Sequence, residues 1–174
     1  MFTEIEKDYC RWSKKGGNFA KYFYAMLFNP GFRAIAFYRM GRWFLMRKRY
    51  HLAGLMEHLI YHTCYCEINR YADIAPGFRI AHTVGLVIGE GTRIGPNCDV
   101  RQNVTLGGNF NKQDENGRTQ PWLEDHVSVG AGAVIVGPVK IGSNSIVGAN
   151  SVVTKDVPNN VIVSGIPAII IKER

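Results

Sequence analysis

The residue of this 174-residue chain best suited to chemistry is His82, and its candidate partner is Glu67, fifteen positions earlier. A carboxylate that hydrogen-bonds one imidazole nitrogen fixes the ring tautomer and raises the basicity of the other nitrogen. Such a base can take the proton of an alcohol. A second interpretation stays open, in which His82 is a surface histidine with a chance acidic neighbour. The other histidines are interpreted as surface or packing residues: His51, His58, His62 and His126.

A six-residue repeat of aliphatic residues explains how such distant positions could meet. It runs from about Ile68 almost to the C-terminus, and small or turn-forming residues follow most of its aliphatic positions. A fixed short period is typical of a parallel β-solenoid, whose stacked coils share one core; a sandwich of alternating strands would show a period of two. Three steps of six make one coil, so Glu67 and His82 should lie on neighbouring coils. Stacked coils are roughly 4.8 Å apart, which makes a hydrogen bond between the two side chains feasible.

The repeat is interrupted twice. Two extra residues fall near His82–Ile88, and eleven fall between Leu106 and Leu123. The second insertion, residues 107–122, is polar and rich in glycine and is expected to loop out of the coil. Loops on a rigid scaffold often carry function. Residues 156–174 are expected to leave the repeat and end in a basic tail.

The first third of the chain is expected to be helical. Predicted helices cover about 18–28, 31–48 and 51–65, and a weaker helical pattern covers residues 1–28. Asn18 is a plausible N-cap, and Asn29-Pro30-Gly31 is a turn and helix-start signal. The expected division is therefore an α-helical domain over 1–65 and a coil domain over 66–174.

The net charge of +7 lies entirely in residues 1–60, which hold eleven Lys and Arg against four Asp and Glu. Because Trp and Phe alternate with basic residues over 39–49, one interpretation is peripheral contact with an anionic membrane. The other is packing of these aromatic residues, with the basic groups solvated. Nucleic acid is not expected as a partner, since no binding motif accompanies the charge.

Cysteine usage and hydropathy point to a cytoplasmic protein. If the basic region contacts an anionic membrane, the protein would lie at the inner face of that membrane. No apolar run reaches the ~18 residues that a membrane span needs. No metal site is expected, because the four cysteines lack the paired spacing of a zinc site, and reduced thiols are the ordinary state in the cytosol. These cysteines are Cys10, Cys64, Cys66 and Cys98.

The repeat and its flanks resemble the left-handed β-helix (hexapeptide-repeat) acyltransferases, and more narrowly their serine acetyltransferase branch. The matching segments cover most of the chain in order: EINRYADIAPGFRIAH (67–82), VIGEGTRIG (87–95), NVTLGG (103–108), VGAGAVIVGPVKIG (129–142) and VGANSVVTKDVP (147–158). The fold that this resemblance implies is mainly β, a left-handed parallel β-helix preceded by a small α-helical region.

The same resemblance implies acetyl-CoA as the acetyl donor and a homotrimeric coil. It places the catalytic histidine at His82 and its carboxylate partner at Glu67. The positions that it implies for coenzyme A contacts are Gly108, Asn109, Ala131 and Ala149.

The acceptor is where the chain departs from that branch. Serine acetyltransferases have an Asp before the catalytic His, where this chain has Ala81, and an Arg-His pair before the loop Pro, where it has Thr119-Gln120. Arg118 and Gln120 are the remaining candidates for binding the acceptor.

Zwitterionic serine needs both a fixed cation and a fixed anion, so these departures favour the hydroxyl of a sugar or polysaccharide precursor. The polar side chains of the loop suit such a glycan acceptor: Asn109, Asn111, Gln113, Asn116 and Gln120, together with Trp122. Two alternatives stay open, namely serine acetylation for cysteine synthesis and a non-catalytic scaffold.

Overall fold

Helices occupy the N-terminal third of the chain. The computed structural model describes residues 1–13, 16–110 and 112–174. Asn18 and Asn29 begin two of the helices, since their side chains accept hydrogen bonds from the N–H groups of Lys21 and Phe32 at 3.1 and 3.0 Å. No helix in these described ranges is long and apolar enough to cross a membrane. The four helices are α1 (Phe2–Ser13), α2 (Phe19–Phe28), α3 (Pro30–Met46) and α4 (Tyr50–Cys64).

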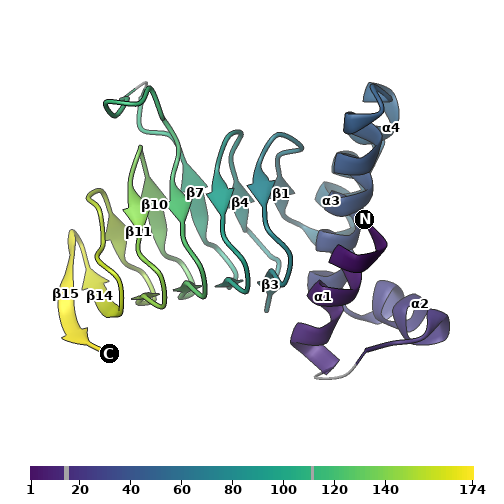
Figure 1. Cartoon of the computed structure of the whole chain (residues 1–174), viewed down its shortest axis with the longest axis horizontal. Helices are drawn as coiled ribbons and strands as arrows, with labels where there is room; N and C mark the ends of the chain where they lie inside the picture. The colour runs from purple at the N-terminus through teal and green to yellow at the C-terminus, as the bar shows by residue number, and fades with distance from the viewer. Residues whose placement is uncertain (14–15, 111) are drawn as a thin grey trace.

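The rest of the chain forms short strands in three sheets, which we call faces A, B and C (Figure 1); their strands up to β14 pair in parallel. Face A holds β1 (Glu67–Ile68), β4 (Val87–Ile88), β7 (Thr105–Gly107), β10 (Val134–Val136) and β13 (Val152–Val153). Face B holds β2 (Asp73–Ile74), β5 (Arg93–Ile94), β8 (Trp122–Leu123) and β11 (Lys140–Ile141). Face C holds β3 (Arg79–Ile80), β6 (Asp99–Val100), β9 (Ser128–Val129), β12 (Ile146–Val147), β14 (Val161–Gly165) and β15 (Ala168–Glu173).

Successive strands up to β13 pass from face A to B to C and back to A, so the chain winds as a three-sided coil. Thr105 follows its partner Val87 by 18 positions, which is the expected length of one coil. The two interruptions appear in the pairing too, because Glu67 and Val87 are 20 positions apart and Thr105 and Val134 are 29 apart. The prediction of a mainly β fold after a small helical region is confirmed.

Turns between the faces form the edges of the coil, and two of these edges hold the candidate site residues. The C–A edge consists of residues 81–86, 101–104, 130–133 and 148–151. The A–B edge includes residues 69–72, 89–92, 108–110, 112–121, 137–139 and 154–156. Residues 108–110 and 112–121 belong to the long loop that projects from the side of the coil in Figure 1.

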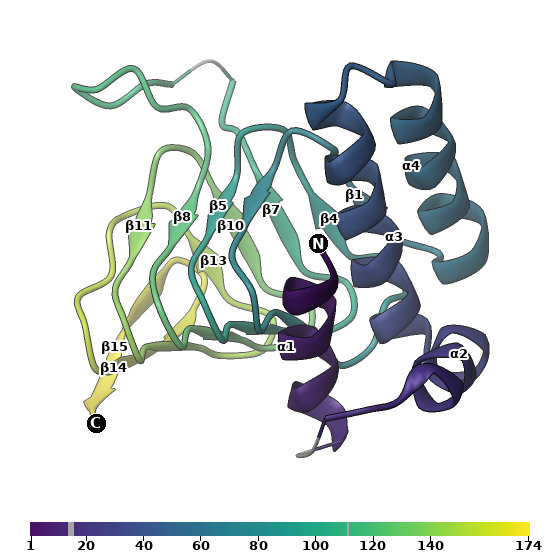
Figure 2. The ribbon, with the colours of Figure 1, turned by 45° about the vertical axis from the view of Figure 1, so that its right-hand side comes forward.

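The helices pack against the first coil and share its core (Figure 2). Phe32 and Ile35 of α3 are buried in one cluster with the inward aliphatic side chains of the strands, such as Ile68 and Ile80. This approach requires a glycine at position 31, because a Cβ on Gly31 would lie 2.0 Å from the carbonyl oxygen of Ile80.

A buried ion pair anchors α1 and α3 to the same coil. Asp8 is fully buried, and its carboxylate lies 2.9 Å from Arg39 Nε. It also accepts hydrogen bonds from the N–H groups of Gly77 and Phe78, at 2.7 and 3.0 Å. Burial raises the pKa of Asp8, and the Arg39 side chain and these backbone bonds oppose that rise. Arg39 donates in turn to two carbonyl oxygens of the coil, those of Ile74 and Ala75.

The C-terminal segment differs from the prediction of a tail. β14 joins face C in parallel with β12, and β15 folds back on β14 in antiparallel pairing. The spacing shortens here, since Ile162 pairs with Ile146, only 16 positions earlier. A shorter step breaks the six-residue phase, which is why the sequence pattern did not reveal this last strand pair.

Candidate active site

His82 lies exposed on the C–A edge, in its first and longest turn. That turn has six residues, 81–86, where the later turns of this edge have four. Backbone bonds fix both of its ends, since the Ala81 N–H donates to the Val100 carbonyl at 3.0 Å and the Gly85 N–H donates to the Tyr65 carbonyl at 2.9 Å. The two extra residues therefore present the imidazole to solvent on an otherwise regular edge.

Glu67 lies beside this turn, on the outer side of face A. It is exposed and pairs with Val87, and its N–H donates to the Leu86 carbonyl at 2.8 Å. The coil thus brings Glu67 and the turn of His82 to neighbouring places. Within the described part of the chain, however, no hydrogen bond joins the two side chains. The carboxylate–imidazole pair stays a prediction.

Ala131 and Ala149 lie on the same edge as His82, farther along the coil. The Asn150 N–H donates to the Ala131 carbonyl at 2.8 Å, which stacks the two turns directly. The packing is close, because a Cβ on Gly130 would lie 2.6 Å from the backbone nitrogen of Ala149. Small residues therefore suit the close stacking of these two turns.

The remaining candidate residues lie on the other edge. Gly108 and Asn109 begin the long loop of the A–B edge, and Gln120 closes it: the Gln120 amide nitrogen lies 2.8 Å from where a Gly108 Cβ would be. Arg118 is part of the same loop. Since face A separates the two edges, a single chain does not bring these four residues together with His82.

The guanidinium of Arg118 is already engaged inside the loop. It forms an ion pair with Asp114 at 3.0 Å, and its Nη2 donates to the Pro138 carbonyl at 3.1 Å. The Asp114 carboxylate also accepts hydrogen bonds from the N–H groups of Arg118 and Asn116, at 2.8 and 3.0 Å. These bonds, the Arg118 N–H first, lower the pKa of Asp114. The side chains of Asp114 and Arg118 therefore hold the loop itself.

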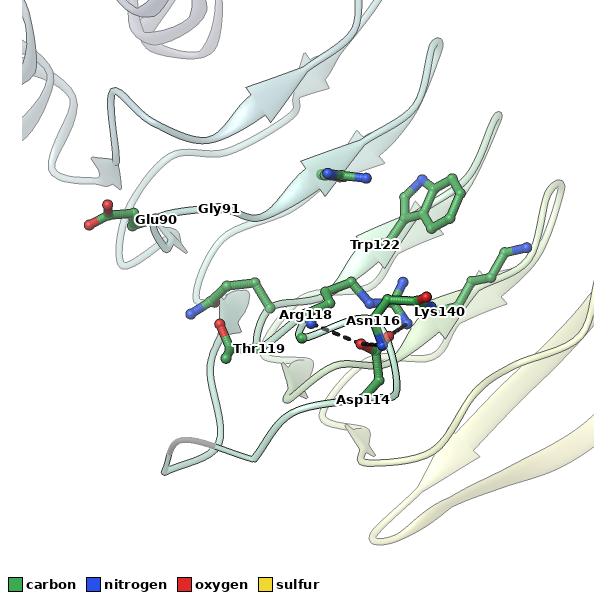
Figure 3. A pocket seen from close by; sticks show the side chains of 11 residues that line it. Glu90, Gly91, Asp114, Asn116, Arg118, Thr119, Trp122 and Lys140 are labelled. Carbon is green, nitrogen blue, oxygen red and sulfur yellow. Dashed lines mark hydrogen bonds and ion pairs between the residues drawn. The ribbon is translucent and has the colours of Figure 1, made fainter.

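Beneath the loop is a cavity of about 790 Å³ on face B (Figure 3). Its floor includes Trp122, whose ring lies 5.0 Å from Lys140 Nζ and 5.8 Å from the Arg118 guanidinium carbon. Asn111, one of the loop residues considered for a glycan acceptor, lies outside the described residues.

One charged residue of the C–A edge did not stand out in the sequence. Arg101 occupies the turn that follows the turn of His82, and it is exposed. Across the described ranges it forms no hydrogen bond or ion pair. Counting one 20-residue coil from Ala81 reaches Arg101, so the signal was present in the spacing. A repeat of aliphatic and small residues does not point to a charged residue on a turn.

Among the described residues, no three His, Cys, Asp or Glu side chains are placed to hold a metal ion. Burial raises the pKa of the Cys66 and Cys98 thiols to about 12, so both stay protonated and unreactive at neutral pH.

Comparisons with known proteins agree with this arrangement. The bacterial transferase hexapeptide family (six repeats) matches residues 121–155. The chain is 39% identical to a serine acetyltransferase of Synechococcus elongatus over 84% of its own length, and spans 59% of that curated relative.

Two solved structures are similar over almost the whole chain. A serine acetyltransferase of Neisseria gonorrhoeae in complex with serine has a TM-score of 0.85 and 30% identity, covering 98% of this chain and 69% of that one. A serine acetyltransferase of Brucella abortus in complex with coenzyme A has a TM-score of 0.82 and 32% identity, covering 99% and 66%.

The expectation of a sugar or polysaccharide acceptor is wrong, because these relatives are serine acetyltransferases. The polar loop was misleading because polar side chains alone do not identify the acceptor. In the structure, two charged side chains of the loop serve the loop itself, since the Asp114 carboxylate binds the loop backbone and Arg118 is its ion-pair partner.

Proposed function

Since the chain belongs to the hexapeptide-repeat transferase family, in its serine acetyltransferase branch, we propose that it transfers the acetyl group of acetyl-CoA to the hydroxyl of serine. The observation that carries the proposal is the exposed imidazole of His82 on an edge whose later turns hold the small residues Ala131 and Ala149. That edge offers a base for the hydroxyl proton and room for the coenzyme A arm beside these small residues.

In this proposal His82 acts as general base. It takes the proton of the serine hydroxyl while that oxygen attacks the thioester carbonyl carbon. The carbon–sulfur bond then breaks, and His82 returns the proton to the leaving sulfur. Glu67 orients the imidazole from face A. Ala131 and Ala149 let the pantetheine arm approach the backbone of the edge, and Gly108 and Asn109 complete the coenzyme A site from the loop.

The separation of the two edges supports a homotrimer, in which the loop of one copy reaches the C–A edge of the next. Most outward side chains of face A are apolar and half-buried, which suits a buried contact: Val87, Val134, Val136 and Val152. The exceptions are the polar Thr105 and the exposed Glu67 at the helical end. Face B carries charge instead, at Asp73, Arg93 and Lys140. We further propose that the coil is left-handed. The chain has two domains, an α-helical one over 1–65 and the coil over 66–174, and the protein is cytoplasmic.

The trimer can be tested by placing a charge on face A. Val134→Asp should convert the trimer to monomers, since an unpaired carboxylate is costly to bury in an apolar contact. The matched control is Ile146→Asp, which changes another half-buried, outward-facing branched residue, on face C. Light scattering after size exclusion gives the mass of each variant. A trimer that survives Val134→Asp at the same protein concentration would exclude face A as the contact.

The acetyl transfer can be tested on the purified full chain. With acetyl-CoA and serine, we expect serine-dependent release of free thiol, and O-acetylserine identified by mass spectrometry. A reaction without acceptor measures thioester hydrolysis, and a reaction with glucose tests a neutral hydroxyl. Thiol release that does not change when serine is added would refute the proposed function.

Contact of residues 1–60 with an anionic membrane stays a prediction. The feature that supports it is the surface of α2, a helix within this basic region. It exposes several large apolar side chains: Phe19, Phe23, Tyr24, Leu27 and Phe28.

A further inference from the structure

We propose that Arg101, rather than Arg118, binds the carboxylate of the acceptor next to His82. This inference rests on the proposed function, because it assigns the residue that recognises the substrate of that reaction. It defines the acceptor as a small hydroxyl compound that carries a carboxylate close to the hydroxyl.

The position of Arg101 follows from the pairing of the first two coils. Arg79 pairs with Asp99 and Ile80 with Val100, so Ala81 stands opposite Arg101 on the C–A edge. The backbone bond from Ala81 N–H to the Val100 carbonyl holds the two turns together at 3.0 Å. His82 follows Ala81 directly, which places the imidazole and the guanidinium one coil apart on the same edge.

The positive charge of Arg101 is also available to bind a substrate carboxylate on this edge. The nearest acid in sequence is Asp99, and both of its carboxylate oxygens are already used, by Arg11 at 2.6 Å and by Arg79. The chain has no acid opposite Arg101, where Ala81 stands. An exposed guanidinium without a carboxylate partner among the described residues is well suited to bind a carboxylate with two parallel hydrogen bonds.

The loop cation is a weaker candidate on the same physical grounds. Arg118 already has a carboxylate partner in Asp114 and a carbonyl partner in Pro138. To bind an acceptor it would have to give up both contacts and the loop structure that depends on them.

The turn of Arg101 has a second polar group without a partner. The side-chain amide oxygen of the adjacent Gln102 is buried, and no hydrogen bond to it is found in the described residues. Buried acceptors are nearly always paired. This acceptor is therefore available to a donor from outside the chain, whether water, a substrate or a second copy.

The experiment compares Arg101→Gln with wild type, using serine and its neutral-amide analogue serinamide as acceptors. For serine, the KM should rise about 10- to 100-fold in Arg101→Gln, the usual effect of losing a hydrogen bond to a charged group, while kcat changes little. For serinamide, which lacks the carboxylate, the two proteins should have similar KM values. Arg101→Lys should recover part of the loss. The matched control is Arg93→Gln, which removes another exposed arginine, on face B.

Three outcomes would overturn the proposal while leaving the proposed function standing. One is a serine KM that Arg101→Gln leaves unchanged. Another is an equal KM for serine and serinamide in the wild type. The third is a rise in serine KM in Arg118→Gln but not in Arg101→Gln. A wild-type protein that acetylates neither acceptor would instead refute the proposed function, and the role of Arg101 with it.

Discussion

Replacing His82 by alanine is expected to lower kcat for acetyl transfer by about 10²- to 10⁴-fold, the usual contribution of a general base. The loss should be in turnover rather than in folding, because the side chain is exposed on a turn whose backbone bonds come from Ala81 and Gly85. Turnover is measured as thiol release from acetyl-CoA at saturating serine.

The matched control is His51→Ala, which removes another exposed histidine, in α4 and far from the C–A edge in sequence. It should keep wild-type turnover. Both variants should have the wild-type mass in light scattering and the same thermal unfolding midpoint. A folded His82→Ala protein that retains full activity would remove His82 as the base.

Replacing Asp8 by alanine is expected to lower the free energy of unfolding by about 3–5 kcal/mol, the usual cost of leaving one member of a buried ion pair alone. The reason is the position of Arg39, which is 4% exposed and keeps its charge after the change. The N–H groups of Gly77 and Phe78 also lose their acceptor. Denaturant unfolding, followed by tryptophan fluorescence at one fixed protein concentration, gives the difference.

A milder variant keeps the test usable if Asp8→Ala does not fold. Asp8→Asn retains an acceptor oxygen of similar shape and should be destabilised by less than the alanine variant. Glu6→Ala is the control, since Glu6 is an exposed acid on the same helix, and it should change stability by no more than about 0.5 kcal/mol. If the stabilities of Asp8→Ala and Glu6→Ala are equal, the ion pair does not anchor the helices.

The coil could be predicted because one physical requirement recurs at every strand. Each strand from β1 to β13 buries one aliphatic residue, so Ile68, Ile74 and Ile80 follow a six-residue period that a single sequence reveals. The interruptions were predictable for the same reason, since extra residues shift that period. Where the step itself changes, as between Ile146 and Ile162, the pattern does not predict a strand.

The anchor of the helices could not be predicted, because it depends on contacts between distant residues. Asp8 lies 31 positions from Arg39 and 69 from Gly77. In the sequence it is one acid among several in a weakly helical segment, and only the folded chain removes it from water.

The candidate site was predictable in part. The disturbed repeat located His82, and the resemblance supplied Ala131 and Ala149, which the structure places on the same edge. The assignment of Arg118 used its position before the loop proline, but its ion pair with Asp114 depends on how the loop folds. A sequence pattern does not report such a contact.

The way in which α1 and α3 cover the first coil has a consequence for assembly. The first coil, made of β1, β2 and β3, would leave a row of unpaired backbone groups if nothing covered it. Such a row can pair with strands of another protein molecule, end to end. Here the side chains of Asp8 and Arg39 take up N–H and carbonyl groups of that row. The helices therefore also protect this end of the protein against growth into fibres.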